Sequence, residues 1–411
     1  MQAPAMDSVT QCCIAGGGPA GLVLGYLLAR CGVCVTVLEK HDDFLRDFRG
    51  DTIHPSTLTV LDDLGLLEDF LRLPHQEVGE LTAQVYGEQV TLADFRHLPS
   101  ARPFLVLVPQ WDFLDFIADR GRELPGFELR MGAKATGLVN EGGRVTGLRV
   151  QGREGAYTVR ADLVVAADGR HTTLRASAGL PVTDVGAPID VLWFRLPRSP
   201  GHPDATGGMI GPGAMLVTLN RDTYWQCAYV IPKGSLEHLQ EEGLDEFRAR
   251  VIRTAPFLAD VIASLAGWDD VKLLTVQINY LQRWYREGFL CIGDAAHAMS
   301  PVGGVGINLA IQDAVAAANL LAQPLRENRL RVEDLQAVQD RRLFPARATQ
   351  RAQVAVQDGV LSPLLARTDA PAKPPFAIKL FQRLPLLRRL PARMVGMGVR
   401  PERVRRDLLR K

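Results

Sequence analysis

The sequence predicts an α/β fold with two interleaved domains and a helical region at the C-terminus. Three observations predict it: a strand, glycine turn, helix and strand near the N-terminus, two later apolar strands that end in aspartate-containing loops, and central segments of alternating apolar and polar residues. A chain of 411 residues exceeds the length that one hydrophobic core usually supports, so two domains are expected.

Residues 14–39 supply the first observation. An apolar strand leads into a Gly-x-Gly-x-x-Gly turn, a helix follows, and a second strand ends at an acidic residue. Such glycines permit a tight turn and let the backbone approach a pyrophosphate, which the N–H groups of the helix N-terminus can bind. Glu39 lies 23 residues after Gly16, where a carboxylate accepts hydrogen bonds from ribose hydroxyls. The unit predicts a Rossmann-like domain with dinucleotide contacts at Gly16, Gly18, Pro19, Ala20, Gly21, Glu39 and Lys40.

Two later strands supply the second observation. Residues 161–168 form an apolar strand that ends in Asp168, and residues 288–294 form another that ends in Asp294. An aspartate at the carboxyl end of a strand can accept a hydrogen bond from a sugar hydroxyl. The glycine-rich loop at 304–306 opens a helix whose N–H groups can face a flavin carbonyl and stabilise charge there. The glycine turn alone does not choose between FAD and NAD, and these two segments favour FAD.

With these three motifs in order, the chain resembles the class A flavoprotein monooxygenases, the p-hydroxybenzoate hydroxylase-like group of FAD enzymes. The match spans residues 9–325. The resemblance implies that Asp294 binds the ribityl or pyrophosphate region of FAD, that Pro301 lies beside the isoalloxazine ring, and that the following backbone contacts the pyrimidine edge of the ring. The residues implied in FAD binding by these two later motifs are Asp168, Gly293, Asp294, Pro301, Gly304, Val305, Gly306, Ile307 and Asn308.

Two smaller matches extend the resemblance. Arg49 follows Glu39 by ten residues, and in the family an arginine there reaches the FAD. Gln110 occupies a position where relatives carry arginine or glutamine directed at the ribityl chain. The chain departs mildly from the family pattern, with Thr172 where serine is frequent and Val305 where glutamine is frequent. Any contact of Val305 with the cofactor must therefore come from its backbone.

The resemblance implies a monooxygenase that hydroxylates a phenolic or polycyclic aromatic small molecule through a flavin C4a-hydroperoxide, using O₂ and NAD(P)H. FAD is expected to bind tightly and noncovalently, because it carries the chemistry while the protein orients and shields it. A second Gly-x-Gly-x-x-Gly unit is absent from the sequence. NAD(P)H is therefore expected to bind transiently, and the sequence does not distinguish NADH from NADPH. No metal site is predicted.

Three residues are candidates for contact with the substrate. His54 follows the Arg49 loop, and an imidazole suits proton transfer near neutral pH, although it could equally serve to start the helix at Pro55. Tyr224 and Trp225 lie on one predicted strand, where alternation points one of the two toward the substrate. We predict His54 as the catalytic residue and Tyr224 and Trp225 as substrate contacts.

The motifs divide the chain into interleaved segments. The FAD-binding domain is predicted to comprise residues 9–75, 109–180 and 284–325. The substrate-binding sheet is predicted to comprise residues 76–108 and 181–283, and a helical region with a basic tail to comprise 326–411. Within these segments, helices are expected at Thr57–Phe70, Asp112–Glu123 and Leu244–Thr254, and strands at Val191–Leu196, Ala214–Leu219 and Tyr224–Ile231.

Composition is typical of a globular protein. Hydrophobic residues make up 47% and charged residues 23% of the chain, and no run of 18 apolar residues predicts a membrane-spanning helix. The first eight residues lack the basic and apolar regions of a signal peptide. Cys31 and Cys34 are spaced as a C-x-x-C pair but lie at the end of a helix rather than its start, so they are expected to be structural. A reducing cytoplasm is the expected compartment.

The C-terminal tail is basic. Residues 373–411 contain twelve lysines and arginines and two acidic residues, interleaved with apolar side chains. Contact with a membrane surface is one interpretation. The favoured interpretation is that the tail folds back on the core, because Leu384, Leu386, Leu387, Leu390 and Met394 are too many apolar residues to leave exposed. Nucleic-acid binding is not expected, and oligomeric state is not predicted.

Two other classes of enzyme share parts of this pattern. A flavin-dependent halogenase carries a W-x-W-x-I-P motif, of which this chain keeps only Ile231 and Pro232. A flavin-dependent reductase or dehydrogenase of isoprenoid or quinone-like substrates is the second alternative, and a flavoprotein sensor without catalysis is a third. Dependence on chloride would identify a halogenase, and turnover without O₂ would identify a reductase or dehydrogenase. FAD binding without NAD(P)H oxidation would identify a sensor.

Overall fold

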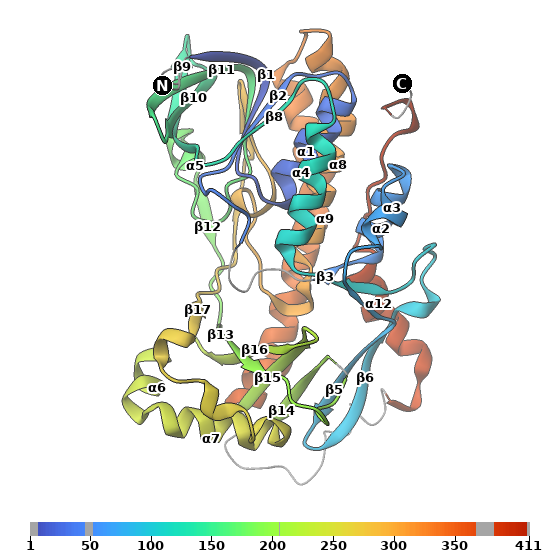
Figure 1. Ribbon diagram of the computed structural model, residues 1–411. Coiled ribbons are helices and arrows are strands. Elements are labelled where there is room, and N and C mark those ends of the chain that lie inside the picture. Colours follow the sequence, from blue (N-terminus) through green and yellow to red (C-terminus); the bar gives the residue numbers. More distant parts are fainter. Residues whose placement is uncertain (1–6, 46–51, 205, 367–381, 409–411) are drawn as a thin grey trace.

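The computed structural model describes residues 7–45, 52–204, 206–366 and 382–408 (Figure 1). Its mixed α/β architecture confirms the predicted fold class. One sheet with its helices occupies the upper part of Figure 1, and a second sheet occupies the lower part. The domain boundaries drawn from the sequence stay predictions.

The first sheet has eight strands in the order β19-β20-β11-β1-β2-β8, with β10 and β9 continuing from β11. The strands that carry the motifs are parallel, and their last residues lie side by side: Ala15 is opposite both Leu38 and Ala166, and Ala166 is opposite Cys291. The strands are β1 (Ser8–Ala15), β2 (Val35–Leu38), β8 (Phe127–Arg130), β9 (Lys134–Glu141), β10 (Arg144–Gly152), β11 (Gly155–Ala166), β19 (Tyr285–Arg286) and β20 (Phe289–Cys291).

Helices α1 (Pro19–Arg30), α4 (Gln110–Arg122), α8 (Gly306–Arg326) and α9 (Val332–Val356) pack on this sheet and on one another. The helix over Asp112–Glu123 was predicted within two residues. Among the described residues, only the helical stretch Val302–Arg326, which contains α8, is long and apolar enough to cross a membrane. Since 78% of its apolar window is buried inside the protein, α8 is explained as a core helix.

The predicted single helix over Thr57–Phe70 is wrong. The chain forms α2 (Pro55–Asp63) and a separate short helix α3 (Leu67–Phe70). Gly65 lies between the two helices with a φ of 71°, a left-handed conformation that ends a helix and favours glycine. Apolar spacing continues across this break because both helices bury side chains in the same core.

The second sheet has seven strands in the order β17-β13-β16-β15-β14-β5-β6. They are β5 (Glu80–Val85), β6 (Glu88–Asp94), β13 (Ile189–Pro197), β14 (Gly207–Gly211), β15 (Ala214–Asn220), β16 (Tyr224–Pro232) and β17 (Lys272–Leu274). One face packs against α6 (Leu236–Glu242) and α7 (Leu244–Thr254). Helix α7 has the bounds that the sequence predicted. The other face buries Val191 and Val230 together with Leu361, which follows α9.

Short elements connect the two sheets. Strands β3 (Thr52–Ile53), β7 (Leu105–Leu107) and β4 (Gln76–Val78) form a small sheet, and β12 (Val182–Asp184) pairs with β18 (Asn279–Leu281). The remaining helical elements are α5 (Leu174–Ser177), α10 (Ser362–Ala366), α12 (Arg389–Gly396) and the short turns η1 (Phe95–His97), η2 (Pro256–Leu258), η3 (Ile262–Ser264), η4 (Trp268–Asp270), η5 (Gly293–Ala295), η6 (Val302–Gly304), η7 (Gln357–Leu361), η8 (Pro385–Arg388) and η9 (Arg406–Leu408).

The expectation that the apolar tail residues are buried is wrong. Helix α12 packs beside β6 through Ala392 and Gly396, which are buried. Its outer side and the preceding turn expose the predicted residues by 40–69%: Leu384, Leu386, Leu387, Leu390 and Met394. A helix turns only one face to its neighbour, and the face that α12 turns to the core carries the small residues. Because these apolar residues are exposed, their burial is no argument against contact of the tail with a membrane surface.

A buried group of charged residues joins α8, α9 and the C-terminal segment. Arg342 is fully buried; its Nε donates to Asp313 Oδ1 at 2.9 Å and one of its NH groups to Glu402 Oε1 at 3.3 Å. Burial would raise the pKa of Asp313, but His297 and Arg342 outweigh it and hold that pKa below its usual value. Arg341 binds Glu402 through two further hydrogen bonds.

Replacing Arg342 by methionine is expected to destabilise the protein by roughly 3–5 kcal/mol, because two buried carboxylates lose their shared counter-charge. The measurement is urea unfolding of the purified protein. The control is Arg72→Met, which removes an ion pair with Asp69 from a side chain that is 79% exposed, and it should change stability by less than about 1 kcal/mol. Similar losses in both variants would contradict the importance of the buried group.

Candidate flavin site

The glycine turn lies at the carboxyl edge of the first sheet. A Cβ on Gly16 would lie 2.5 Å from the carbonyl oxygen of Ala167, and one on Gly21 would lie 1.9 Å from the carbonyl oxygen of Gly16. These two glycines are required by packing of the protein itself. A Cβ on Gly18, at the start of α1, would meet no atom within 4 Å, and no side chain caps this helix. The turn therefore leaves open space and uncapped N–H groups where a pyrophosphate would lie.

Glu39 is buried and holds the turn in place. One carboxylate oxygen accepts from the N–H of Gly17 and the other from the N–H of His41, each at 3.0 Å. A carboxylate has about four acceptor positions, so these two hydrogen bonds alone do not fill it. Lys40, the next residue, is exposed. The arrangement fits the predicted contact of Glu39 with a ribose.

Asp168 lies against the same turn. Its α-carbon would be 2.8 Å from a Cβ on Gly16, and its Oδ1 atom is buried with no hydrogen-bond partner among the described residues. Burial raises the pKa of this carboxyl to about 6, with Thr172, Lys40 and Arg175 acting in the opposite direction. A buried acceptor without a donor fits a ligand that brings a hydroxyl group. The geometry fits the predicted contact of Asp168 with FAD, which stays a prediction.

The third motif closes over the start of α1. A Cβ on Gly293 would lie 3.2 Å from that of Ala310 and 3.3 Å from that of Ala20, so the loop, α8 and α1 meet there. The N–H of Gly293 donates to Asp313 at 3.0 Å, which fixes the loop just before Asp294. Asp294 is partly exposed, so its carboxylate is accessible to a ligand. Since parallel strands bring Gly16, Asp168 and Gly293 to one edge, the three motifs form one site.

The loop from Pro301 to Gly306 has a backbone that requires glycine. Gly303 and Gly304 have φ values of 79° and 61°, and a Cβ on Gly304 would lie 2.3 Å from Thr52 Oγ1. Helix α8 then begins at Gly306 with no side-chain cap on the preceding Val305. The first N–H groups of a helix, here including that of Ile307, have no partner within the helix. Their contact with a flavin carbonyl stays a prediction.

The side chain of Asn308 has a role that the sequence did not indicate. Its Oδ1 accepts from the backbone N–H of His54 and from Thr57 Oγ1, both at 2.8 Å, and its Nδ2 donates to the carbonyl of Thr52 at 3.0 Å. It thereby fastens the β3–α2 segment to α8. Contact of Asn308 with the ring through its backbone stays a prediction.

His54 is fully buried at the start of α2. Its Nδ1 lies 2.7 Å from the carbonyl oxygen of Val395 on α12, and because a carbonyl only accepts, Nδ1 carries the proton. Burial lowers the pKa of His54 to about 4, so the ring is neutral near pH 7. Nε2 is then an acceptor, and it has no partner among the described residues. The structure places His54 both as an anchor for α12 and as a free acceptor near the β3 segment.

Tyr224 and Trp225 lie on opposite faces of the second sheet. Trp225 is fully buried on the α7 side, where its Nε1 donates to His202 at 2.9 Å and its ring packs against Phe257. Tyr224 is partly exposed, with the Arg195 guanidinium 5.2 Å from its ring centre. Of the two predicted substrate contacts, only Tyr224 lies on the face that does not pack against α7.

Two further predicted residues have less structural support. Gln110 is the first residue of α4 and is partly exposed, and its contact with the ribityl chain stays a prediction. Arg49 lies outside the described residues. The sequence reasoning missed Gln353, whose amide donates to the carbonyls of Ser300 and Val302 at 2.8 Å each and so holds the loop around Pro301. The signal available in the sequence was that Gln353 lies on the same helix face as Arg342.

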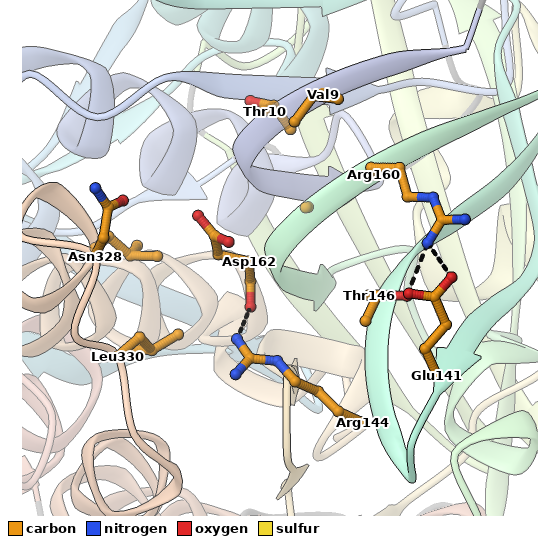
Figure 2. Close-up of a pocket in the computed structure, with 11 residues that line it drawn as sticks. Val9, Thr10, Glu141, Arg144, Thr146, Arg160, Asp162, Asn328 and Leu330 are labelled. Atoms are coloured by element: carbon orange, nitrogen blue, oxygen red, sulfur yellow. Dashed lines mark hydrogen bonds and ion pairs between the residues drawn. The ribbon is translucent and has the colours of Figure 1, made fainter.

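A separate cavity lies at the opposite, amino end of the parallel strands. Figure 2 shows that both of its arginines are hydrogen-bonded: Arg160 to Glu141 and Thr146, and Arg144 to the backbone carbonyl of Asp162. Its volume is about 390 Å³. Because its cations are already paired and the motif loops lie at the other end of the strands, we assign it no part in the flavin site.

Replacing Gly18 by alanine should weaken FAD binding and leave the stability of the apoprotein within about 0.5 kcal/mol of the wild type, because the added methyl enters space that the protein leaves open. The matched variant Gly21→Ala places the same methyl against the backbone and should lower stability by roughly 1–3 kcal/mol. Flavin fluorescence and urea unfolding measure the two effects. Unchanged FAD affinity in the Gly18 variant would contradict the position of the pyrophosphate.

Asp168→Asn is expected to stabilise the apoprotein at alkaline pH while weakening FAD binding. The folded-state pKa of about 6 exceeds the unfolded value, so the folded protein binds the extra proton below about pH 6 and loses stability as pH rises through that value. The asparagine variant should be more stable by roughly 1–3 kcal/mol near pH 8 and should show no advantage near pH 4. Asp162→Asn is the control, since Asp162 is exposed on β11, the strand that precedes Asp168. A pH-independent difference would refute this assignment.

Comparison with known proteins places the site in a family. Residues 9–352 match the family model described as FAD binding domain. The 6-methylpretetramide 4-monooxygenase of Streptomyces rimosus is 36% identical over 98% of this chain and 96% of its own length. Other relatives of about 30% identity are longer, and the chain covers 60–63% of their lengths.

Solved structures show the same fold. The anhydrotetracycline hydroxylase OxyS of S. rimosus has a TM-score of 0.74 at 24% identity, covering 94% of this chain and 76% of its own. The myxobacterial chondrochloren halogenase CndH has a TM-score of 0.71 at 18% identity, covering 93% and 97%. The fold is thus common to hydroxylases and halogenases. The relative that matches over nearly its whole length is a monooxygenase, and this favours hydroxylation. The chain belongs to the FAD-binding-domain family and is an FAD-dependent aromatic monooxygenase, as the resemblance predicted.

Proposed function

We propose that the protein hydroxylates a polycyclic phenol of the pretetramide type, with FAD bound tightly and noncovalently, NAD(P)H bound transiently, and the reaction taking place in the cytoplasm. The observation that carries this proposal is the 36% identity with a 6-methylpretetramide 4-monooxygenase across nearly the whole of both chains. Identity of that extent includes the second sheet as well as the cofactor motifs, so it concerns the substrate side of the site too.

The residues present fit FAD. Gly18 leaves space for the pyrophosphate, Asp168 offers a buried acceptor, and the first turn of α8 offers uncapped N–H groups. When bound, FAD would supply the activation of O₂, and the chain's own residues would hold it and the aromatic ring in position. Asp294 and Gly306 are the residues through which we expect the ribityl chain and the ring to be held.

The second sheet is suited to exclude water from an apolar substrate. Its inner face presents Val191, Ala228 and Val230, which are buried with Leu361. Water exclusion is required because reactive oxygen species at a flavin otherwise decay without product. Placing a planar aromatic ring between this apolar face and the loop at Pro301 would meet that requirement.

A phenol reacts faster when its hydroxyl is deprotonated or donates a strong hydrogen bond. Neutral His54, with Nδ1 occupied by Val395, offers Nε2 as an acceptor. A pKa of about 4 makes this nitrogen a weak base, so we propose that His54 accepts a hydrogen bond from the substrate or a water and does not store its proton. We propose Tyr224 as a substrate contact. Trp225 packs on the other face of the sheet, and we propose no substrate contact for it.

The test is turnover of 6-methylpretetramide by FAD-loaded protein under ¹⁸O₂. We expect the substrate to stimulate NAD(P)H oxidation, with one labelled oxygen in the product and little H₂O₂ released. The Gly18→Ala variant, which should bind FAD poorly, controls for uncatalysed oxidation. Label from water, turnover without O₂, or a requirement for chloride would each reject hydroxylation and identify a different chemistry.

A further inference from the structure

One face of α9 and of the turn that follows it carries mostly polar side chains at helical spacing. The face consists of Gln339, Arg342, Ala346, Gln350 and Gln353 on α9 and of Gln357 just after it, each three or four residues from the next. Gln339 donates to the carbonyl of Gln282 at 3.0 Å. Gln350 donates to the carbonyls of Asn279 and Ala298 at 2.9 and 2.8 Å. These two glutamines therefore each hold a backbone segment in place.

Gln357 is the exception on this face. Its side chain is fully buried, yet neither its Nε2 nor its Oε1 has a hydrogen-bond partner in the described part of the chain. Two nearby atoms, Gln353 Oε1 and Ser362 Oγ, are also buried without a partner there. A buried amide without hydrogen bonds is costly, so native structures rarely keep one unless a ligand or water satisfies it.

Backbone geometry marks the same position. Residues Gln357–Leu361 form a π-helical turn, η7, between α9 and α10. Such turns are rare within helices and occur frequently at functional sites, because the extra residue redirects side chains that a regular helix would place elsewhere. The irregular turn and the unpartnered amide are two independent observations at one residue.

The surroundings of Gln357 place it between the two domains. One helical turn earlier, Gln353 binds the carbonyls of Ser300 and Val302, on either side of Pro301. One turn later, Leu361 is buried with the inner face of the second sheet. Gln357 therefore lies between the loop proposed to carry the flavin ring and the face proposed to cover the substrate.

We propose that Gln357 binds the aromatic substrate through both atoms of its amide. An amide with donor and acceptor both unpartnered is complementary to a group that presents an acceptor and a donor side by side. The substrate class is therefore an aromatic ring bearing a carboxamide, or a hydroxyl next to a carbonyl. This inference rests on the proposed function, since it assigns a specificity residue to the same site.

The experiment compares Gln357→Leu with wild-type protein, both loaded with FAD. Leucine is similar in size and removes both polar atoms. We expect an unchanged or higher Tm, FAD affinity within about twofold, and a Kd for 6-methylpretetramide at least about tenfold weaker, measured by flavin difference absorbance without NAD(P)H. Preference for salicylamide over phenol should be lost as well.

Two variants on the same helix are the controls. Gln336→Leu lies on the exposed side of α9 and should change none of the three measurements. Gln353→Leu removes the hydrogen bonds to Ser300 and Val302 and should weaken FAD binding, which Gln357→Leu should not. This pair separates a residue that positions the flavin loop from one that contacts the substrate.

Either of two outcomes overturns the assignment of Gln357. A Tm several degrees below the wild type would show that its amide already has a partner in the free protein. Unchanged substrate affinity would show that a water, and not the substrate, satisfies it. If wild-type protein fails to bind 6-methylpretetramide, the proposed substrate is wrong, and the Tm and the salicylamide preference still decide the role of Gln357.

Discussion

The buried carboxylate of Asp313 connects the parts of this protein that matter for the flavin site. It accepts hydrogen bonds from Gly293, His297 and Arg342 at 3.0, 2.6 and 2.9 Å. These donors come from the third motif and from α9, while Asp313 belongs to α8. Through Arg342 the same group reaches Glu402 near the C-terminus. Removing one charged member leaves the others buried without compensation, which makes the arrangement stable only as a whole.

Helix α9 and its continuation extend this connection from the first sheet to the second. Its buried glutamines bind carbonyl groups of the segments around Asn279 and Ser300, and its C-terminal continuation packs on the second sheet (Figure 1). The position of the loop at Pro301 relative to the apolar face of the sheet is therefore set by one rigid element. Enzymes of this kind require such precision, because the reacting atoms of substrate and cofactor must be held within a short distance of each other.

Polar atoms without partners mark where ligands are expected. Asp168 Oδ1 lies by the glycine turn, His54 Nε2 by the β3 segment, and the Gln357 amide between the domains. Beside Gln357, the buried atoms Gln353 Oε1 and Ser362 Oγ also lack a partner among the described residues. An unpartnered carboxylate oxygen, imidazole nitrogen and amide suit a sugar hydroxyl, a phenol and a carbonyl-bearing ring respectively.

The sequence by itself determined the fold class, the cofactor and the residues of the glycine turn, because these follow from local patterns: Gly16, Gly21 and Glu39 act within one βαβ unit. It also predicted Asp168 and Asp294 at the same edge of the sheet, and they lie just after β11 and β20, since parallel strands bring such ends to one edge. Tertiary structure alone decided that Trp225 packs against α7, that helix 57–70 divides at Gly65, and that Leu386 and Leu390 are exposed. It alone revealed the contacts of Asp313, the side-chain hydrogen bonds of Asn308 and the buried amide of Gln357 as well. These depend on contacts between residues far apart in the chain, and periodicity shows which side chains share a face without showing what that face meets.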